Sequence, residues 1–320
     1  MMDPLSLVTR NTVEVITEEE LNELLLQPEK RVYTGYEPSG EIHLGHLVTV
    51  NKLIDMQEAG FEVVVLLADL HAFLNRKGTM EEVREMAEWN RRCFEAVGLR
   101  DVEFVLGSDI QLDREYDLNV LMLSQQITLN RAKRSMDEVG RQMEAPTVSQ
   151  MIYPLMQMVD IYTLGVDAAV GGIDQRKIHM LAREYLPLLQ KKAPVCIHTP
   201  ILNGLDGKKM SSSAGNYISI ADSEEEINRK IAKAFCPPEI EANPVLQILQ
   251  YHVFPRMEEF TIRRPPKFGG DRTFSSYAPL ESAYAAGEIH PKDLKNAAAL
   301  GLNEILGSAR EYLDRAGGPA

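Results

Sequence analysis

The chain of 320 residues contains few cysteines and no long apolar segment. Its three cysteines are Cys93, Cys196 and Cys236, and their wide spacing argues against a disulfide framework or a zinc site. No apolar run reaches the roughly 18 residues that a membrane-spanning helix requires. The N-terminal segment lacks the basic and apolar stretches of a secretory signal. We therefore expect a cytoplasmic protein with reduced thiols and without a membrane partner.

Basic residues are also in deficit. The chain has 34 Lys and Arg against 47 Asp and Glu, and its net charge is −13. This balance argues against a general nucleic-acid binder, and we expect no DNA partner. An acidic protein can still present a local basic face, although a solvated helix face explains each basic cluster equally well. The clusters are Arg131, Lys133, Arg134 and Arg141; Arg176 and Lys177; and Arg263, Arg264 and Lys267.

The first two thirds of the chain alternates between strand-like and helix-like segments. The continuous apolar run at 61–68 is typical of a strand buried on both faces of a parallel sheet. Helices are expected at 44–59 and at 79–97, where Thr79 and Glu82 form a capping-box pattern. The alternation predicts an α/β fold with a doubly wound parallel, Rossmann-like sheet. The expected strands are 32–36, 61–68, 102–106, 168–171 and 195–198.

Two regions depart from this alternation and suggest further parts of the fold. The segment at about 112–148 begins helical and then becomes basic, which indicates a helical insertion packed beside the sheet. A second capping box at Ser223 and Glu226 opens a stretch of helices interrupted by proline and glycine. We therefore expect a catalytic, nucleotide-binding domain at 1–222 and a helical domain at 223–320.

A histidine pair lies where an expected strand gives way to an expected helix. His43 and His46 are three residues apart, so both imidazoles project from the same side of the first helical turn. The carboxyl edge of a parallel sheet is where such folds bind ligands, and a helix N-terminus favours phosphate. Gly45 leaves room for a nucleotide against the backbone. A pair of surface histidines would be the plainer interpretation of this motif alone.

A second motif, Lys209-Met210-Ser211-Ser212-Ser213, lies in an expected loop between Gly207 and Gly215. A lysine can supply a mobile positive charge to pyrophosphate, and serines and loop amides can add hydrogen bonds. Flanking glycines allow such a loop to move during a reaction. A flexible solvated loop would explain this motif about as well when it is taken alone.

Together the two motifs resemble the HIGH and KMSKS signatures of class I aminoacyl-tRNA synthetases. Their order and separation fit the tyrosyl and tryptophanyl group, and the chain looks most like the archaeal and eukaryotic kind of tyrosyl enzyme. The resemblance covers nearly the whole chain, including 35–40 and 169–175. The chain departs from the usual pattern at Ser212, where many members have lysine, so Lys209 would carry most of the positive charge of the loop.

The resemblance implies a tyrosine–tRNA ligase. Such an enzyme joins L-tyrosine to ATP, giving tyrosyl-adenylate and pyrophosphate, and then transfers tyrosine to the 3′ end of tRNA(Tyr). Mg²⁺ would accompany ATP as part of the substrate complex, without a tightly bound protein metal. The resemblance implies catalytic roles for His43, His46, Lys209 and Ser212. The ATP contacts that it implies are His43, Gly45, His46, Gly172, Asp174, Lys209, Met210, Ser211 and Ser212.

Three polar residues form a stripe on an otherwise apolar expected helix. Tyr153, Gln157 and Asp160 are spaced by four and three residues, and a buried carboxylate there needs a partner or a ligand. A structural hydrogen-bond network is the alternative. The resemblance implies that Tyr153, Gln157 and Gln175 hold the α-amino group of tyrosine and that Asp160 and Tyr33 hold its phenol. Gly35 and Glu37 would complete this site, whereas Leu66, Ala68 and His71 rank lower, and His71 is better explained as a core or rim histidine.

The resemblance also implies contacts with tRNA and with a second copy of the chain. Asp293 and His290 match a segment that contacts the first anticodon base, on which Phe268 could stack. Arg134, Arg176 and Lys177 match positions near the acceptor end. The plainer interpretation of His290 and Asp293 is an ordinary helix start. The apolar segment 118–129 would form the interface of a homodimer.

Two other functions stay open from the sequence. A tryptophan–tRNA ligase would share both motifs, but an indole offers only one donor and needs no paired Tyr33 and Asp160. A catalytically silent relative that binds RNA would have no need to keep His43, His46 and Lys209. These residues therefore favour an active enzyme for tyrosine.

Overall fold

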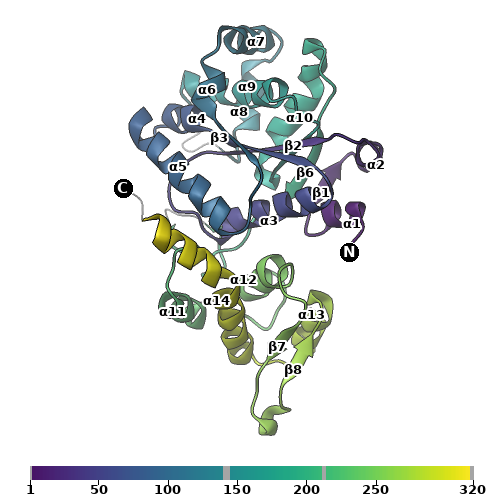
Figure 1. Ribbon diagram of the computed structural model, residues 1–320, viewed down its shortest axis with the longest axis vertical. Helices are drawn as coiled ribbons and strands as arrows, with labels where there is room; N and C mark the ends of the chain where they lie inside the picture. Colours follow the sequence, from purple (N-terminus) through teal and green to yellow (C-terminus); the bar gives the residue numbers. More distant parts are fainter. Residues whose placement is uncertain (1, 140–144, 211–213, 318–320) are drawn as a thin grey trace.

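The computed structural model describes residues 2–139, 145–210 and 214–317 (Figure 1). A six-stranded sheet with the order β1-β6-β5-β2-β3-β4 forms its centre. All neighbouring strands are parallel except β1, which pairs antiparallel with β6. The predicted doubly wound sheet is confirmed, and the antiparallel edge strand β1 is an addition. The strands are β1 (Glu14–Ile16), β2 (Arg31–Tyr36), β3 (Glu62–Leu67), β4 (Glu103–Leu106), β5 (Ala168–Gly172) and β6 (Val195–Thr199).

Both faces of the sheet are covered by helices, as the continuous apolar run in β3 predicts. Val63, Val65 and Leu67 enter one buried cluster with α3 and α5, and Val64 and Leu66 enter another with α7 and α9. Thr79 and Glu82 form the predicted capping box of α5. The helices of this part are α1 (Pro4–Thr9), α2 (Glu18–Leu25), α3 (Leu44–Glu58), α4 (Asp69–Leu74), α5 (Met80–Ala96), α6 (Gly107–Gln111), α7 (Arg114–Ser124), α8 (Leu129–Ser135), α9 (Val148–Thr163) and α10 (Arg176–Tyr185), with 3₁₀ turns η1 (Ile173–Gln175) and η2 (Leu186–Leu189).

The rest of the chain is mainly helical and extends away from the sheet (Figure 1). Ser223 and Glu226 form the second predicted capping box. The short hairpin of β7 and β8 was not expected in a helical region. The elements are α11 (Glu224–Lys233), α12 (Pro244–Ile248), the π-helix η4 (Leu249–Val253), β7 (Phe260–Ile262), the 3₁₀ turn η5 (Pro266–Phe268), β8 (Arg272–Phe274), α13 (Tyr277–Ala285) and α14 (Pro291–Ala316).

Helix α14 connects this part with the sheet. Its first half packs in a core with α12 and β7, and Leu302, Leu306 and Leu313 join the cluster that also contains Phe94 of α5. One apolar core therefore continues across the expected boundary at 222–223, and the division into two domains stays a prediction. No helix among the described residues has both the length and the apolar character needed to cross a membrane.

Candidate active site

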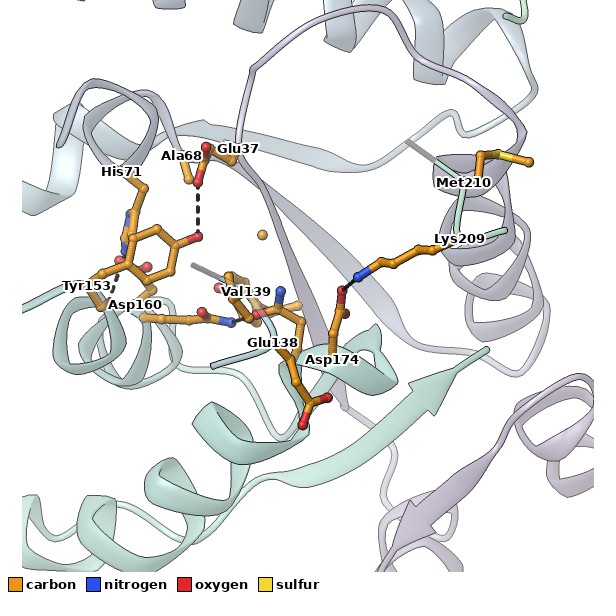
Figure 2. A pocket seen from close by; sticks show the side chains of 14 residues that line it. Glu37, Ala68, His71, Glu138, Val139, Tyr153, Asp160, Asp174, Lys209 and Met210 are labelled. Carbon is orange, nitrogen blue, oxygen red and sulfur yellow. Dashed lines mark hydrogen bonds and ion pairs between the residues drawn. The ribbon is translucent and has the colours of Figure 1, made fainter. Parts of the chain in front are cut away.

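A pocket of about 450 Å³ opens at the carboxyl ends of the parallel strands. β2 pairs with β3 on one side and with β5 on the other, so the strand order reverses at β2. Ligands of doubly wound folds bind at such a point. The pocket is lined by Tyr33 and Gly35 of β2, by Ala68 directly after β3, and by Asp174 in η1, which follows β5. Figure 2 labels Ala68 and Asp174. The lining residues are Tyr33, Gly35, Glu37, Ala68, His71, Glu138, Val139, Tyr153, Gln157, Asp160, Asp174, Gln175, Lys209 and Met210.

His43 and His46 meet at the N-terminus of α3, with ring centroids 4.0 Å apart. His43 Nδ1 accepts a hydrogen bond from the Gly45 amide at 3.1 Å, and His46 Nδ1 accepts one from the His43 amide at 3.2 Å. The hydrogen of each ring is therefore on Nε2. Burial lowers the pKa of His43 to about 3 and that of His46 to about 4. At neutral pH the pair consists of two neutral N–H donors.

Gly45 allows the two motifs to approach each other. A Cβ atom at this position would lie 2.9 Å from His43 Cε1 and 3.2 Å from the sulfur of Met210. The side chain of Met210 is therefore packed over the start of α3, although the two segments are far apart in sequence. The histidine motif itself is not among the residues that line the pocket, and Met210 lies between the two.

Lys209 and Asp174 face each other across one part of the pocket. Its Nζ lies 3.6 Å from Asp174 Oδ2, and the lysine side chain is 59% exposed (Figure 2). Burial raises the pKa of Asp174, and the charge of Lys209 opposes that rise. Gly172 lies directly behind Asp174, because a Cβ there would be 2.6 Å from Asp174 Oδ1. Ser211 and Ser212 lie outside the described residues. Among the residues that are described, no group of three or more His, Cys, Asp or Glu could hold a metal ion.

The closed end of the pocket contains Asp160 and Tyr33, which are each 1% exposed. Asp160 Oδ1 accepts hydrogen bonds from Tyr116 and Gln111, while its Oδ2 has no partner among the described residues. Burial raises the pKa of Asp160 to about 7. Gly35 makes room for the Tyr33 hydroxyl, since a Cβ at Gly35 would lie 2.7 Å from it. This end thus offers an unpaired carboxylate oxygen and a phenol.

The other end of the pocket gathers groups that suit an ammonium ion. The Tyr153 hydroxyl donates to Glu37 at 3.3 Å (Figure 2). Gln157 Nε2 donates to Gln175 Oε1 at 3.2 Å. The Glu37 carboxylate also accepts from Asn75 at 2.8 Å and lies 3.5 Å from Lys77 Nζ. A carboxylate and several amide and hydroxyl oxygens can bind a protonated amine.

Several residues of this pocket were not found from the sequence. Gln111 and Tyr116 bind Asp160 from α6 and α7, and Glu138 and Val139 line the pocket. Ala68 and His71, which ranked low, both line the pocket, whereas Leu66 does not. His71 is also buried with both ring nitrogens in hydrogen bonds, one with Gln111 and one with the Tyr153 carbonyl, as expected for a core histidine. No local sequence pattern distinguishes these residues from ordinary core positions.

A second cavity, of about 340 Å³, lies beside the segment that leads into the histidine motif. It is bounded by Pro38, Ser39 and Gly40 on one side and by α5 on the other. Trp89 of α5 lines this cavity and packs against the main core. Lys77, which contacts Glu37 in the main pocket, also borders it. The two cavities are therefore neighbours on either side of the same segment.

The expected basic residues gather at a third cavity, of about 430 Å³, between α8 and α10. Arg134, Arg176 and Lys177 all line it. Nearby carboxylates offset part of their charge: Glu14 binds Arg176, and Glu138 lies 2.9 Å from Lys177 Nζ. This arrangement is a local basic surface on an acidic protein.

The remaining expected residues lie in the part of the chain farthest from the sheet. Phe268 is 60% exposed in η5, under the Lys267 ammonium. His290 caps α14, whose first turn contains Asp293. Arg264 links the two places, since it donates to the carbonyls of Gly270 and Glu288. An exposed ring and a carboxylate are thus available on one end of the molecule.

Comparison with known proteins connects the chain with one family. The family model described as tRNA synthetases class I (W and Y) matches residues 27–307. A curated tyrosine–tRNA ligase from Methanoculleus marisnigri is 75% identical, over 98% of this chain and 99% of that protein. The tyrosine–tRNA ligase of Methanospirillum hungatei is 70% identical, over 98% of this chain and all of that protein.

Solved structures give the same picture. The crystal structure of tyrosyl-tRNA synthetase complexed with L-tyrosine from Archaeoglobus fulgidus matches with a TM-score of 0.95 and 58% identity, covering 97% of this chain and 98% of that one. A tryptophanyl-tRNA synthetase from Aeropyrum pernix K1 matches with a TM-score of 0.72 at 24% identity, covering 90% and 79%. The match with the tryptophanyl-tRNA synthetase shows a shared fold alone. The sequence of this chain is more similar to the tyrosine proteins than to that tryptophan protein.

Proposed function

The chain belongs to the class I tRNA synthetases for tryptophan and tyrosine, and we propose that its pocket carries out the reaction of a tyrosine–tRNA ligase. The carboxylate of L-tyrosine attacks the α-phosphate of ATP, which enters with Mg²⁺, and pyrophosphate leaves. The resulting tyrosyl-adenylate then gives tyrosine to the 3′ end of tRNA(Tyr). The observation that carries this proposal is the closed end of the pocket, where Asp160 Oδ2 is buried near Tyr33 and has no partner in the part of the chain that the structure describes.

Activation of tyrosine requires positioning and charge stabilisation more than covalent chemistry from the protein. The Nε2–H groups of His43 and His46 are neutral donors for the phosphate oxygens on which charge develops. Lys209 is exposed and movable, so it can leave Asp174 and follow the departing pyrophosphate. Gly45, Gly172, Asp174 and Met210, with Ser211 and Ser212 of the same loop, complete the proposed nucleotide site.

Selection of tyrosine rests on its two polar ends. The ammonium group binds near Glu37, Tyr153, Gln157 and Gln175, and the phenol donates to Asp160 Oδ2 while Tyr33 donates to the phenol oxygen. Burial, and then the charge of Asp160, raise the pKa of Tyr33 well above its ordinary value, so its hydroxyl stays protonated. Phenylalanine would leave the buried Asp160 oxygen unpaired. Tyrosine enzymes are the standard example of such rejection.

ATP–pyrophosphate exchange tests the proposed function directly. The protein should exchange with tyrosine and not with tryptophan or phenylalanine. Exchange supported by tryptophan would identify a tryptophan–tRNA ligase instead. A lack of exchange with all three amino acids would identify a catalytically silent relative. Asp160→Ala should lose tyrosine-dependent exchange while it remains folded, which a cooperative thermal unfolding transition shows. Asp109→Ala, an exposed carboxylate on α6, is the matched control and should exchange as the wild type does.

Binding of tRNA(Tyr) is the second part of the proposal. Arg134, Arg176 and Lys177 would contact the acceptor end, and Phe268, His290 and Asp293 the anticodon. Lysine and arginine contacts with phosphates release counterions, so affinity should fall steeply with salt despite the net charge of −13. Arg176→Ala should weaken binding and lower the salt slope by about 1. Arg315→Ala, an 82% exposed arginine at the end of α14, should change neither.

A homodimer in the cytoplasm completes the proposal. Helix α7 presents Leu118, Leu121 and Met122, which are 56%, 61% and 45% exposed. Their spacing places them on one face of the helix. An apolar face of this kind is costly to leave in water and suits a second copy of the same surface. The three cysteines are free, as expected in a reducing compartment.

A further inference from the structure

A chain of buried hydrogen bonds runs beneath the pocket, on residues to which the proposed function gives no role. Asp160 Oδ1 accepts from Gln111 Nε2 at 2.8 Å and from the Tyr116 hydroxyl at 2.8 Å. Gln111 is 1% exposed and Tyr116 is 3% exposed. Both donors reach the same carboxylate oxygen, so Asp160 Oδ2 is left to face the pocket.

The donor and acceptor of each hydrogen bond in this series follow from the two groups at its ends, the Tyr153 carbonyl and the Asp160 carboxylate, which can only accept. His71 Nε2 lies 3.4 Å from the Tyr153 carbonyl, which can only accept, so Nε2 carries the hydrogen and Nδ1 is an acceptor. Burial lowers the pKa of His71 to about 4, which keeps the ring neutral. Gln111 Nε2 lies 3.1 Å from His71 Nδ1. The Gln111 amide therefore gives one hydrogen to His71 and the other to Asp160.

The opposite orientation of the Gln111 amide is unfavourable. It would place Oε1 against two acceptors, one of which is the Asp160 carboxylate. In the observed orientation Gln111 Oε1 is buried and has no partner among the described residues. Gly107 gives it space, since a Cβ at Gly107 would lie 2.8 Å from it. An unpaired buried acceptor is costly, so the two donated bonds must matter to the site.

We propose that Gln111 and Tyr116 are positioning residues for tyrosine specificity: they bind Oδ1 of Asp160, which keeps Oδ2 free and aimed at the substrate phenol. This inference rests on the proposed function, because it assumes that Asp160 binds the phenol. His71 extends the arrangement to the Tyr153 backbone, so the phenol end and the amine end of the pocket share one hydrogen-bonded support.

Hydrogen bonds to a carboxylate favour its charged form, and here they act against burial. Burial raises the pKa of Asp160 to about 7, and Gln111 and Tyr116 oppose that rise. The titratable groups around Asp160 are Tyr33 of β2, Tyr116 of α7, Tyr153 of its own helix, and His71 of α4 through Gln111. These groups are neutral at pH 7. Loss of either donor should therefore raise the pKa of Asp160 and protonate the phenol acceptor at neutral pH.

The experiment compares tyrosine with phenylalanine in ATP–pyrophosphate exchange from pH 5.5 to pH 9. In the wild type the ratio of kcat/KM values should rise with pH through a midpoint near 7, because kcat/KM reports the ionisation of the free enzyme. In Tyr116→Phe and Gln111→Met the ratio at pH 7.5 should fall about threefold, which corresponds to a pKa shift of about one unit upward from a midpoint near 7. The midpoint should move upward, and the ratio should recover toward pH 9.

The matched control is Tyr162→Phe, which removes a hydroxyl from the same helix as Asp160. Among the described residues, Gln111 and Tyr116 donate to the Asp160 carboxylate and Tyr162 does not. It should keep both the wild-type ratio and the wild-type midpoint. Thermal unfolding of each variant checks that it is folded.

Several results would overturn the inference. The first is that the variants keep the wild-type ratio and midpoint. The second is that they lose activity toward both amino acids equally while the midpoint does not move. The third is that the ratio of the wild type does not change with pH. The last result does not depend on whether a variant folds. Absence of tyrosine exchange in the wild type would instead overturn the proposed function, so the two failures are distinct.

Discussion

The two histidines at the start of α3 each use one ring nitrogen for the fold and present the other for the proposed chemistry. His46 Nδ1 accepts from the backbone of His43, and His43 Nδ1 accepts from that of Gly45. The caps fix the tautomers, and burial keeps both rings neutral. The helix start therefore presents two N–H donors whose direction is set before a substrate arrives, which is the condition for electrostatic preorganisation.

His46→Ala should lower kcat for tyrosine-dependent exchange about 10²- to 10³-fold, the usual effect of removing one donor to developing charge. KM for tyrosine should change little, because the tyrosine contacts lie elsewhere in the pocket. The ratio of wild-type to variant kcat should stay constant between pH 6 and 9, since the pKa of His46 is lowered to about 4. A ratio that changes across pH 6 to 7 would contradict the neutral-donor assignment.

Thr79→Ala is the control for loss of a cap alone. Thr79 Oγ1 accepts from the Glu82 amide at the start of α5, so its removal should cost about 1 kcal/mol of stability. The exchange rate should not change, because α5 contributes no group to the reacting atoms.

Asp160 should make stability fall as pH rises. Its pKa is raised from an ordinary value of 3.8 to about 7 by burial, so between these values the folded protein keeps a proton that the unfolded chain has lost. The free energy of unfolding should therefore decrease across this window, by at most about 4 kcal/mol. Asp160→Asn cannot ionise and should gain stability over the wild type at pH 8 but not at pH 4. Urea unfolding at both pH values measures this, and equal pH dependence in the two proteins would contradict it.

At the scale of single elements, α3 connects the active site with the N-terminal helix. Lys52, only 2% exposed, donates to the carbonyls of Leu7, Val8 and Arg10 and lies 3.0 Å from Asp55. Two of these carbonyls belong to α1, and the third belongs to the residue after it. One buried ammonium therefore closes the end of α1 and fixes it to the helix that begins at the histidine motif.

Lys52→Met should lower the free energy of unfolding by about 3–5 kcal/mol, because it leaves Asp55 without one of its buried cations and several carbonyls without a donor. Lys192→Met, an exposed lysine, should change it by less than about 0.5 kcal/mol. Denaturant titration of both variants measures the difference. A loss in Lys52→Met no larger than in the control would show that water replaces these contacts.

The elements that could be predicted from sequence are those with a strong local pattern. β3 is a continuous apolar run, and α5 and α11 have capping boxes at their starts. β1, β7 and β8 are only three residues long each, so neither alternation nor an apolar run can identify them. Their strand conformation depends on pairing with distant partners such as β6.

The pocket residues, like the elements, could be predicted only where the sequence has a local pattern or a family motif. Asp160 stood out because a carboxylate on an apolar helix requires a partner, and Tyr33 and Gly35 followed from the family resemblance. Gln111 and Tyr116 did not, because contact with Asp160 depends on tertiary packing across 49 and 44 residues of sequence. A sequence can show that a buried charge needs donors, but the fold decides which residues supply them.

At the scale of the whole molecule, the expected dimer face and the expected anticodon end lie far apart. Figure 1 shows α7 at one end of the long axis and the β7–β8 hairpin at the other. Association through α7 would therefore leave the hairpin end of each copy accessible to RNA. The candidate active site lies between these ends, at the edge of the sheet.

Leu121→Glu should prevent formation of the proposed dimer, because it places a charge in the centre of the apolar face of α7. Light scattering during size-exclusion chromatography should show a mass near 36 kDa for the variant and twice that for the wild type. Leu300→Glu changes a leucine of similar exposure, 61%, on α14 and should leave the mass unchanged. A wild type that elutes as a monomer would exclude the dimer.

Trp89 gives the whole molecule a natural optical probe. It is the single tryptophan of the chain. From α5 it lines a cavity whose other side is formed by Pro38, Ser39 and Gly40, the segment that leads into the histidine motif. Its fluorescence therefore reports on one place, with no second indole to dilute the signal. A change in emission on rapid mixing with ATP would follow the arrival of the nucleotide in real time, in the unlabelled protein.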